Sequence, residues 1–182
     1  MRPFVQRVLL TTAIAAALAA LGTPPATAAP LDYGGGCTIV PGNRAATVDS
    51  LRFRCSPAQQ DAIFHAASRG AVPMGATSGW VTRPPDMVAM GAAFWQGKVF
   101  YTGPGGGTLL NRSVFGNVWR ADVYPAPAIF DGGPAWGINY APAGTPQLYD
   151  EIREVSPGVW FGYSWRREGP PSQILAFVLA YR

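Results

Sequence analysis

Histidine and cysteine are scarce in this sequence of 182 residues, which holds one His and two Cys. A serine hydrolase needs a His base, but His65 lies upstream of Gly75-Ala76-Thr77-Ser78-Gly79, in which the serine stands one place late for a nucleophile elbow. Zinc needs clustered His and Cys ligands, which two cysteines and one distant histidine do not supply. We therefore predict no metal, no cofactor and no catalytic residue, and the sequence favours a protein that is not an enzyme.

Long apolar runs are also missing, except at the start of the chain. Arg2 and Arg7 flank the beginning of an apolar run over residues 8–21, and Ala26-Thr27-Ala28 is typical of a cleavage site. Residues 1–28 are thus predicted to be a signal peptide, with an uncleaved anchor as the alternative. No later run is long enough for a stable membrane span, so we expect a secreted, extracytoplasmic protein.

Charged residues make up 13% of the chain, and their arrangement excludes two classes of partner. Loss of the signal removes Arg2 and Arg7 from the 14 basic residues, leaving 12 against 10 acidic ones. The remaining basic residues form no stripe interleaved with aromatics, so we predict no nucleic-acid partner. Gly103-Pro104-Gly105-Gly106-Gly107 lacks the Lys-Ser/Thr of a phosphate loop and is predicted to be a hairpin turn.

The two cysteines, Cys37 and Cys55, fall in a segment over residues 29–70 that we expect to be closed by their disulfide. Such a bridge stabilises the fold by about 3 kcal/mol through its effect on the unfolded chain. Ser56 has the character of a helix N-cap, with Gln59 at the capping-box position and Gly70 as a stop. One helix is therefore predicted over residues 57–69.

Beyond Gly70, short apolar runs broken by Gly and Pro are typical of antiparallel β structure. We predict a mainly β protein whose residues 71–182 form a small antiparallel lipocalin-like β-barrel of about eight strands, because closure removes strand edges. A short helix is expected over residues 85–93. The predicted strands are 75–82, 98–102, 108–111, 117–124, 135–140, 148–155, 159–166 and 173–181.

The stretch 148–166 is predicted to be a hairpin turning at Ser156-Pro157-Gly158-Val159. That turn would pair Arg153 with Gly162 and Glu151 with Ser164. The pattern does not decide which hairpin face looks into the barrel. Glu151 and Arg153 are therefore either a structural ion pair or ligand-facing groups.

A set of motifs then carries a resemblance. These are Phe94-Trp95-Gln96-Gly97-Lys98-Val99-Phe100, then Asn111, then Tyr149-Asp150-Glu151-Ile152-Arg153-Glu154-Val155, and Phe161-Gly162. Over residues 75–182 the chain resembles the bacterial GXWXG-type lipocalin-like proteins of unknown function. The resemblance implies a calycin-like barrel with an apolar cavity and no established reaction.

The predicted function is that of an exported protein that binds a small apolar or amphiphilic molecule, such as a lipid or aromatic metabolite, in the barrel. One alternative is a secreted enzyme that uses Asp150 or Glu151 in the same cavity. Another is a structural cell-envelope protein whose barrel is filled, and the oligomeric state is left open. The predicted ligand-binding residues are Trp95, Lys98, Asn111, Asp150, Glu151, Arg153, Phe161, Tyr163 and Trp165.

Overall fold

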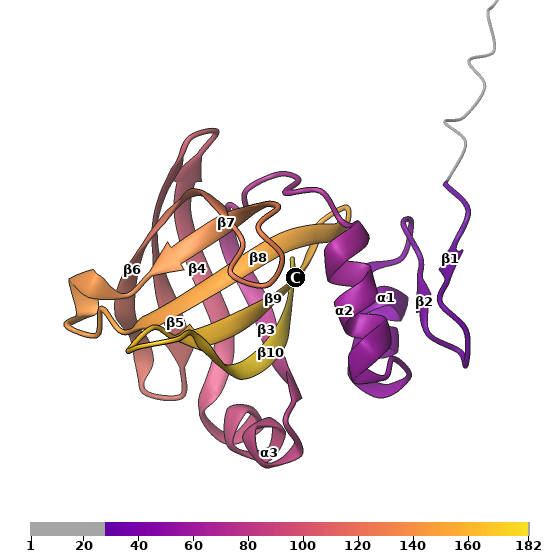
Figure 1. Ribbon diagram of the computed structural model, residues 1–182, viewed down its shortest axis with the longest axis horizontal. Helices are drawn as coiled ribbons and strands as arrows, with labels where there is room; N and C mark the ends of the chain where they lie inside the picture. Colours follow the sequence, from indigo (N-terminus) through magenta and orange to yellow (C-terminus); the bar gives the residue numbers. More distant parts are fainter. Residues whose placement is uncertain (1–27, 182) are drawn as a thin grey trace, which may run out of the picture.

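The computed structural model describes residues 28–181 and contains a closed barrel of eight antiparallel strands (Figure 1). The signal peptide predicted over residues 1–28 lies outside the described residues, except for its last position. Around the barrel the strand order is β10-β3-β4-β5-β6-β7-β8-β9. The predicted mainly β barrel is therefore confirmed.

The eight barrel strands lie close to the positions predicted from the sequence. A short helix, α3 (Pro85–Phe94), connects β3 to β4, also as predicted. The barrel strands are β3 (Gly75–Arg83), β4 (Trp95–Gly103), β5 (Gly106–Ser113), β6 (Gly116–Pro127), β7 (Pro134–Asn139), β8 (Leu148–Ser156), β9 (Val159–Arg166) and β10 (Ser172–Tyr181). A single 3-10 turn, η1 (Ala141–Ala143), lies between β7 and β8.

The N-terminal part of the chain packs against the outside of the barrel. It contains β1 (Leu31–Asp32), β2 (Thr38–Ile39), α1 (Arg44–Phe53) and α2 (Pro57–Ala66), and Figure 1 shows both helices beside the barrel wall. The predicted capping box of Ser56 and Gln59 is present, but α2 ends at Ala66, earlier than expected. Helix α1 was not predicted; its N-cap is Asn43, whose side chain accepts a hydrogen bond from Ala46 N at 3.0 Å.

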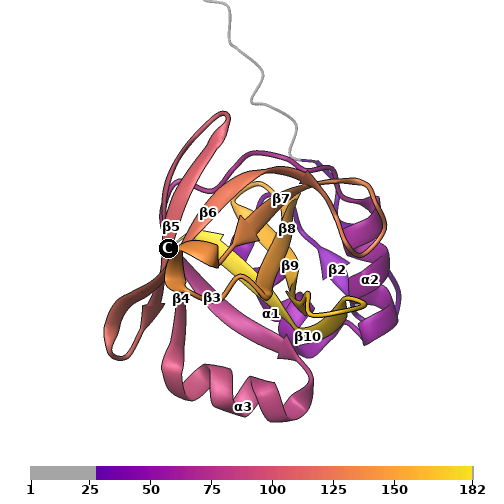
Figure 2. The same ribbon diagram turned by 60° about the vertical axis from the view of Figure 1, so that its left-hand side comes forward.

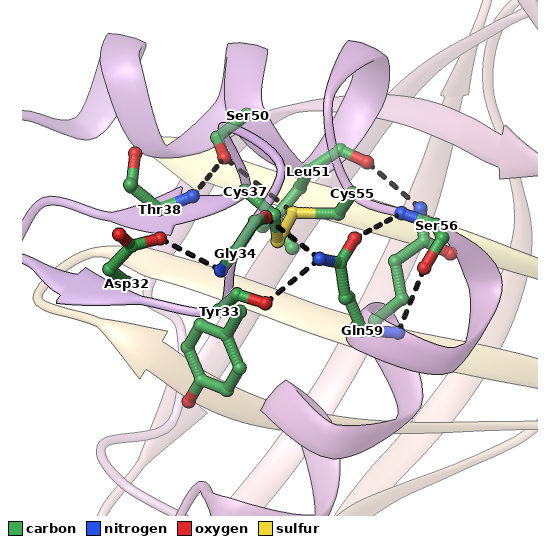
Figure 3. The surroundings of a disulfide bond; sticks show 11 residues. Asp32, Tyr33, Gly34, Cys37, Thr38, Ser50, Leu51, Cys55, Ser56 and Gln59 are labelled. Carbon is green, nitrogen blue, oxygen red and sulfur yellow. Dashed lines mark hydrogen bonds between the residues drawn. A yellow bond between two sulfur atoms is a disulfide. The ribbon is translucent and has the colours of Figure 1, made fainter.

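The predicted disulfide between Cys37 and Cys55 is confirmed, and it joins the residue just before β2 to the link between α1 and α2 (Figure 3). Polar contacts surround it. Ser50 Oγ accepts a hydrogen bond from Thr38 N at 2.7 Å, and Gln59 Nε2 donates to Tyr33 O at 2.9 Å. The disulfide and these contacts fix the N-terminal segment as a unit that can cover the barrel wall.

Two apolar cores result, one inside the barrel and one outside it. The interior core is packed with side chains from strands all around the wall: Phe100, Leu109, Trp136, Ile138, Ile152, Trp160, Phe177 and Leu179. The outer core lies between the helices and β8, β9 and β10, and it includes Leu51, Ile63, Phe64, Phe161, Tyr163, Trp165 and Val178. A barrel of eight strands is just wide enough to be filled in this way.

The predicted register of the β8–β9 hairpin is wrong by one residue. The turn at Ser156–Val159 forms as expected, but a β-bulge between Glu154 and Ser156 shifts the pairing. Arg153 therefore lies opposite Phe161, and Gly162 lies opposite Ile152. A bulge inserts one extra residue into one strand, which sequence alternation does not reveal.

Among residues 28–181, no helix is long and apolar enough to cross a membrane.

Candidate functional site

Four polar side chains meet in the interior of the barrel, close to the end at which β4 begins and β5 ends. We call Lys98, Asn111, Tyr140 and Asp150 the interior polar cluster. Lys98 Nζ donates to Asn111 Oδ1 at 2.9 Å, to the Tyr140 hydroxyl at 2.5 Å and to Asp150 Oδ2 at 2.9 Å. An ammonium group has three donors, so the Lys98 charge is fully satisfied within the protein.

The protons of the cluster can be assigned from its geometry. The Tyr140 hydroxyl donates its proton to Asp150 Oδ2 at 2.7 Å and accepts from Asn111 Nδ2 at 3.2 Å. Burial, together with the nearby charge of Asp150, raises the pKa of Tyr140 well above its ordinary value. Tyr140 is thus a neutral donor, and the formal charges of Lys98 and Asp150 cancel.

Trp95 connects this cluster to the surface. Its indole Nε1 donates to Asn111 Oδ1 at 3.1 Å, and Lys98 Nζ lies 5.4 Å from the centre of the Trp95 ring. The Trp95 ring rests on Gly79, where an added Cβ would lie 2.5 Å from the ring. Trp95 is therefore held in one orientation by a hydrogen bond at one end and by a glycine beneath it.

A hollow of about 470 Å³ lies beside Trp95, near the end of β3 and the start of β4. The regular pairing of these strands covers Gly75 with Phe100 and Ala76 with Val99; beyond it their backbones stay close at Gly79 and Gly97, and α3 connects the two strands. The strand side of the hollow is formed by residues 78–81 of β3, which include Trp80 and Val81, and by Trp95 and Gln96 of β4.

Helix α3 forms the opposite wall of this hollow. Val88, Gly91 and Ala92 face it, a spacing that places them on one side of the helix. None of the α3 residues is buried, although the helix is almost wholly apolar. Figure 2 shows α3 below the barrel, next to β3. An apolar helix with one face over a hollow is suited to cover an apolar molecule.

Arg153, which we expected either inside the barrel or in an exposed pair, lies on the outer wall and is buried there. It is 2% exposed, beneath α2 and the loop between β6 and β7. Its guanidinium donates to Asp131 Oδ2 at 2.8 Å and Oδ1 at 2.6 Å, and to Phe64 O at 2.9 Å. Hydrogen bonds from Arg153 lower the pKa of Asp131 to about 2.

Glu151, the neighbour of Arg153 on this face, forms no ion pair with it in the part of the chain described. Its carboxylate accepts from the backbone N–H of Ile129 at 2.5 Å and of Phe130 at 3.1 Å. Burial raises the pKa of Glu151, although these two N–H groups oppose the change. The suggested Glu151–Arg153 pair is therefore replaced by separate contacts, both to the loop that follows β6.

Phe161, Tyr163 and Trp165 were expected to line the barrel cavity, and the structure places them in the outer core instead. Tyr163 packs edge-on against Phe64 of α2, with ring centroids 4.7 Å apart. The one-residue shift of the hairpin explains the change, because alternate strand positions face opposite sides. Thus the structure brings together Trp95, Lys98, Asn111 and Asp150, whereas the other predicted site residues lie across the barrel wall.

Some residues that complete this region carry no sequence signal. Tyr140 follows β7 directly, next to Ala-Pro, and belongs to no motif, and Arg52 belongs to a helix that was not predicted. Trp80 and Val88 come close only because α3 folds back along β3. Over residues 28–181 no group of three or more His, Cys, Asp or Glu could hold a metal ion.

Comparison with known proteins adds little to this geometry. No family model matches the chain, and no curated protein matches it. A solved structure of a protein from Thermomonospora curvata aligns with 70% of this chain and 88% of its own, at 20% identity and a TM-score of 0.49.

Proposed function

We propose that this protein binds a small apolar or amphiphilic molecule in the hollow between α3 and β3. The observation that carries the proposal is the hollow itself: about 470 Å³, walled by Trp80, Val81 and Trp95 on one side and an apolar helix on the other. The lining also holds polar side chains, among them Ser78 and Gln96, so the hollow is mixed in character and suits an amphiphilic molecule best. The sequence suggested a binding site in the barrel lumen. The proposed site lies elsewhere, because the lumen is packed with large side chains.

The interior polar cluster supports the site from behind. Asn111 accepts from both Trp95 Nε1 and Lys98 Nζ, and it donates to Tyr140 and to Trp119 O. All its hydrogen-bonding capacity is used, so its orientation is fixed. In this proposal Lys98, Asn111 and Asp150 act by positioning Trp95, and they do not themselves contact the ligand.

Export is part of the same proposal. A disulfide between Cys37 and Cys55 fits an oxidising compartment outside the cytoplasm. The enzymatic alternative receives less support, because Asp150 is engaged by Lys98 and Tyr140 while Glu151 lies on the far side of the wall.

A structural envelope role is the second candidate, and the packed barrel interior favours it. Binding distinguishes the two. The neutral fluorescent probe N-phenyl-1-naphthylamine should bind the purified protein, with enhanced probe fluorescence and quenching of tryptophan emission. A structural protein without a site would give neither signal.

A matched pair of variants on α3 tests the location. Ala92→Phe fills the hollow and should weaken probe binding at least tenfold, whereas Ala93→Phe adds the same ring on the side of α3 away from the lining. Both positions are exposed, so neither change should alter the melting temperature appreciably. Equal binding by both variants would place the site elsewhere.

A further inference from the structure

Among the described residues that line the hollow, only Arg52 of α1 carries an ionisable side chain. Its guanidinium carbon lies 5.1 Å from the centre of the Trp80 ring and 4.4 Å from that of Phe53. The cation is thus held at the rim of an apolar surface by two aromatic faces. A planar guanidinium stacked in this way keeps its N–H edges available for an anion.

Arg52 differs in its partners from Arg153, which pairs with Asp131, and from Arg83, which pairs with Asp61. Within residues 28–181, the Arg52 side chain forms no ion pair and no hydrogen bond. Asp49 lies one turn earlier on α1, too far away to form an ion pair with Arg52. The negative charge of Asp49 raises the pKa of Arg52, but burial lowers this pKa by more.

We propose that the hollow takes an amphiphilic anion, whose apolar part lies against Trp80, Val81 and Trp95 and whose acidic head group pairs with Arg52. The inference rests on the proposed function and adds the charge and orientation of the ligand. A carboxylate or a phosphate matches the two parallel N–H groups of a guanidinium. None of the described residues that line the hollow is acidic, so the lining itself offers Arg52 no carboxylate and does not favour a cationic head group.

The experiment compares three molecules that share one chain and differ in head group. Decanoate, 1-decanol and decyltrimethylammonium are titrated at neutral pH against protein loaded with N-phenyl-1-naphthylamine, and displacement is followed by fluorescence. Decanoate should bind about tenfold more tightly than 1-decanol, as expected for a charge-assisted hydrogen-bonded pair. Decyltrimethylammonium should bind most weakly.

Two charge-matched variants identify the residue responsible. Arg52→Gln should reduce decanoate affinity to that of 1-decanol and leave 1-decanol affinity within about twofold. Arg54→Gln removes the same charge from the exposed end of α1, away from this hollow, and should keep the full preference for decanoate.

The outcomes separate this inference from the function on which it rests. If the parent binds 1-decanol as tightly as decanoate, or if Arg52→Gln retains the preference, the head-group assignment is wrong and the apolar site stands. If neither the probe nor any of the three molecules binds, the binding function itself is wrong, and the inference is overturned with it.

Discussion

Replacing Arg153 by Met should destabilise the protein strongly, because Arg153 joins three parts of the fold. From β8 it reaches Phe64 O at the end of α2, Asp131 in the loop after β6, and Pro134 O at the start of β7, the last at 2.9 Å. Methionine retains much of the apolar stem but leaves Asp131 without its cation. Removing one partner of a buried pair costs about 3–5 kcal/mol.

We expect the lower value, about 3 kcal/mol, because the Asp131 side chain is 12% exposed and keeps its contacts with Gly133 N and His65. For a protein of this size, that loss lowers the melting temperature by roughly 6–12 °C. Differential scanning calorimetry or a urea titration measures it. Arg166→Met is the matched control, since Arg166 and Glu168 form an exposed pair, 3.7 Å apart, worth no more than about 1 kcal/mol.

The pH dependence of the unfolding free energy provides a second test of the contact between Arg153 and Asp131. Because Arg153 lowers the pKa of Asp131 in the folded state to about 2, the contact contributes stability that is present above the ordinary pKa near 3.8 and is lost as the pH falls towards 2. The stability difference between parent and Arg153→Met should therefore shrink between pH 4 and pH 2. Adding Asp131→Asn to Arg153→Met should restore part of the loss. If Arg153→Met melts at the same temperature as the parent, or if the double variant is no more stable than Arg153→Met, the ion pair between Arg153 and Asp131 does not stabilise the fold.

Other predictions concern the disulfide, the interior polar cluster and the β8–β9 hairpin. Reduction of the Cys37–Cys55 bridge, which spans 18 positions, should lower the free energy of unfolding by about 3 kcal/mol in urea titrations with and without reductant, and an unchanged midpoint would contradict it. Lys98→Met should cost about 3–5 kcal/mol by stranding Asp150, and adding Asp150→Asn should recover part of this in the same titration; strict additivity would show that the pair is uncoupled. Gly162→Ala should destabilise by about 3 kcal/mol or more, because an added Cβ would lie 2.0 Å from the backbone oxygen of the facing strand, and wild-type stability would show that the register is wrong.

Much of the architecture could be predicted because it depends on local chemistry. Ser56, Pro57 and Gln59 specify the start of α2 through hydrogen bonds within a few residues. Pro157 and Gly158 specify the β8–β9 turn, since Gly158 has a φ of +74° that few other residues adopt. The alternation of apolar residues between Gly and Pro breaks located the strands, and the single cysteine pair allowed one disulfide.

The candidate site could be predicted only in part. Trp95, Lys98, Asn111 and Asp150 do meet, on strands β4, β5 and β8 that are far apart in the chain. Phe161, Tyr163 and Trp165 have the same aromatic character but lie on the other side of the wall, because one bulge residue reverses the facing of a strand.

The barrel, its turns, the disulfide and the residue types available for a site follow from the sequence, because each depends on neighbours close in the chain or on a unique pair. The packed lumen, the pairing of Arg153 with Asp131 and the position of Arg52 beside Trp80 at the rim of the hollow become visible only in the folded chain. Those outcomes depend on how the N-terminal helices and α3 pack against the barrel. Packing between distant segments is set by the shape and burial of whole surfaces, which periodicity along the chain does not encode.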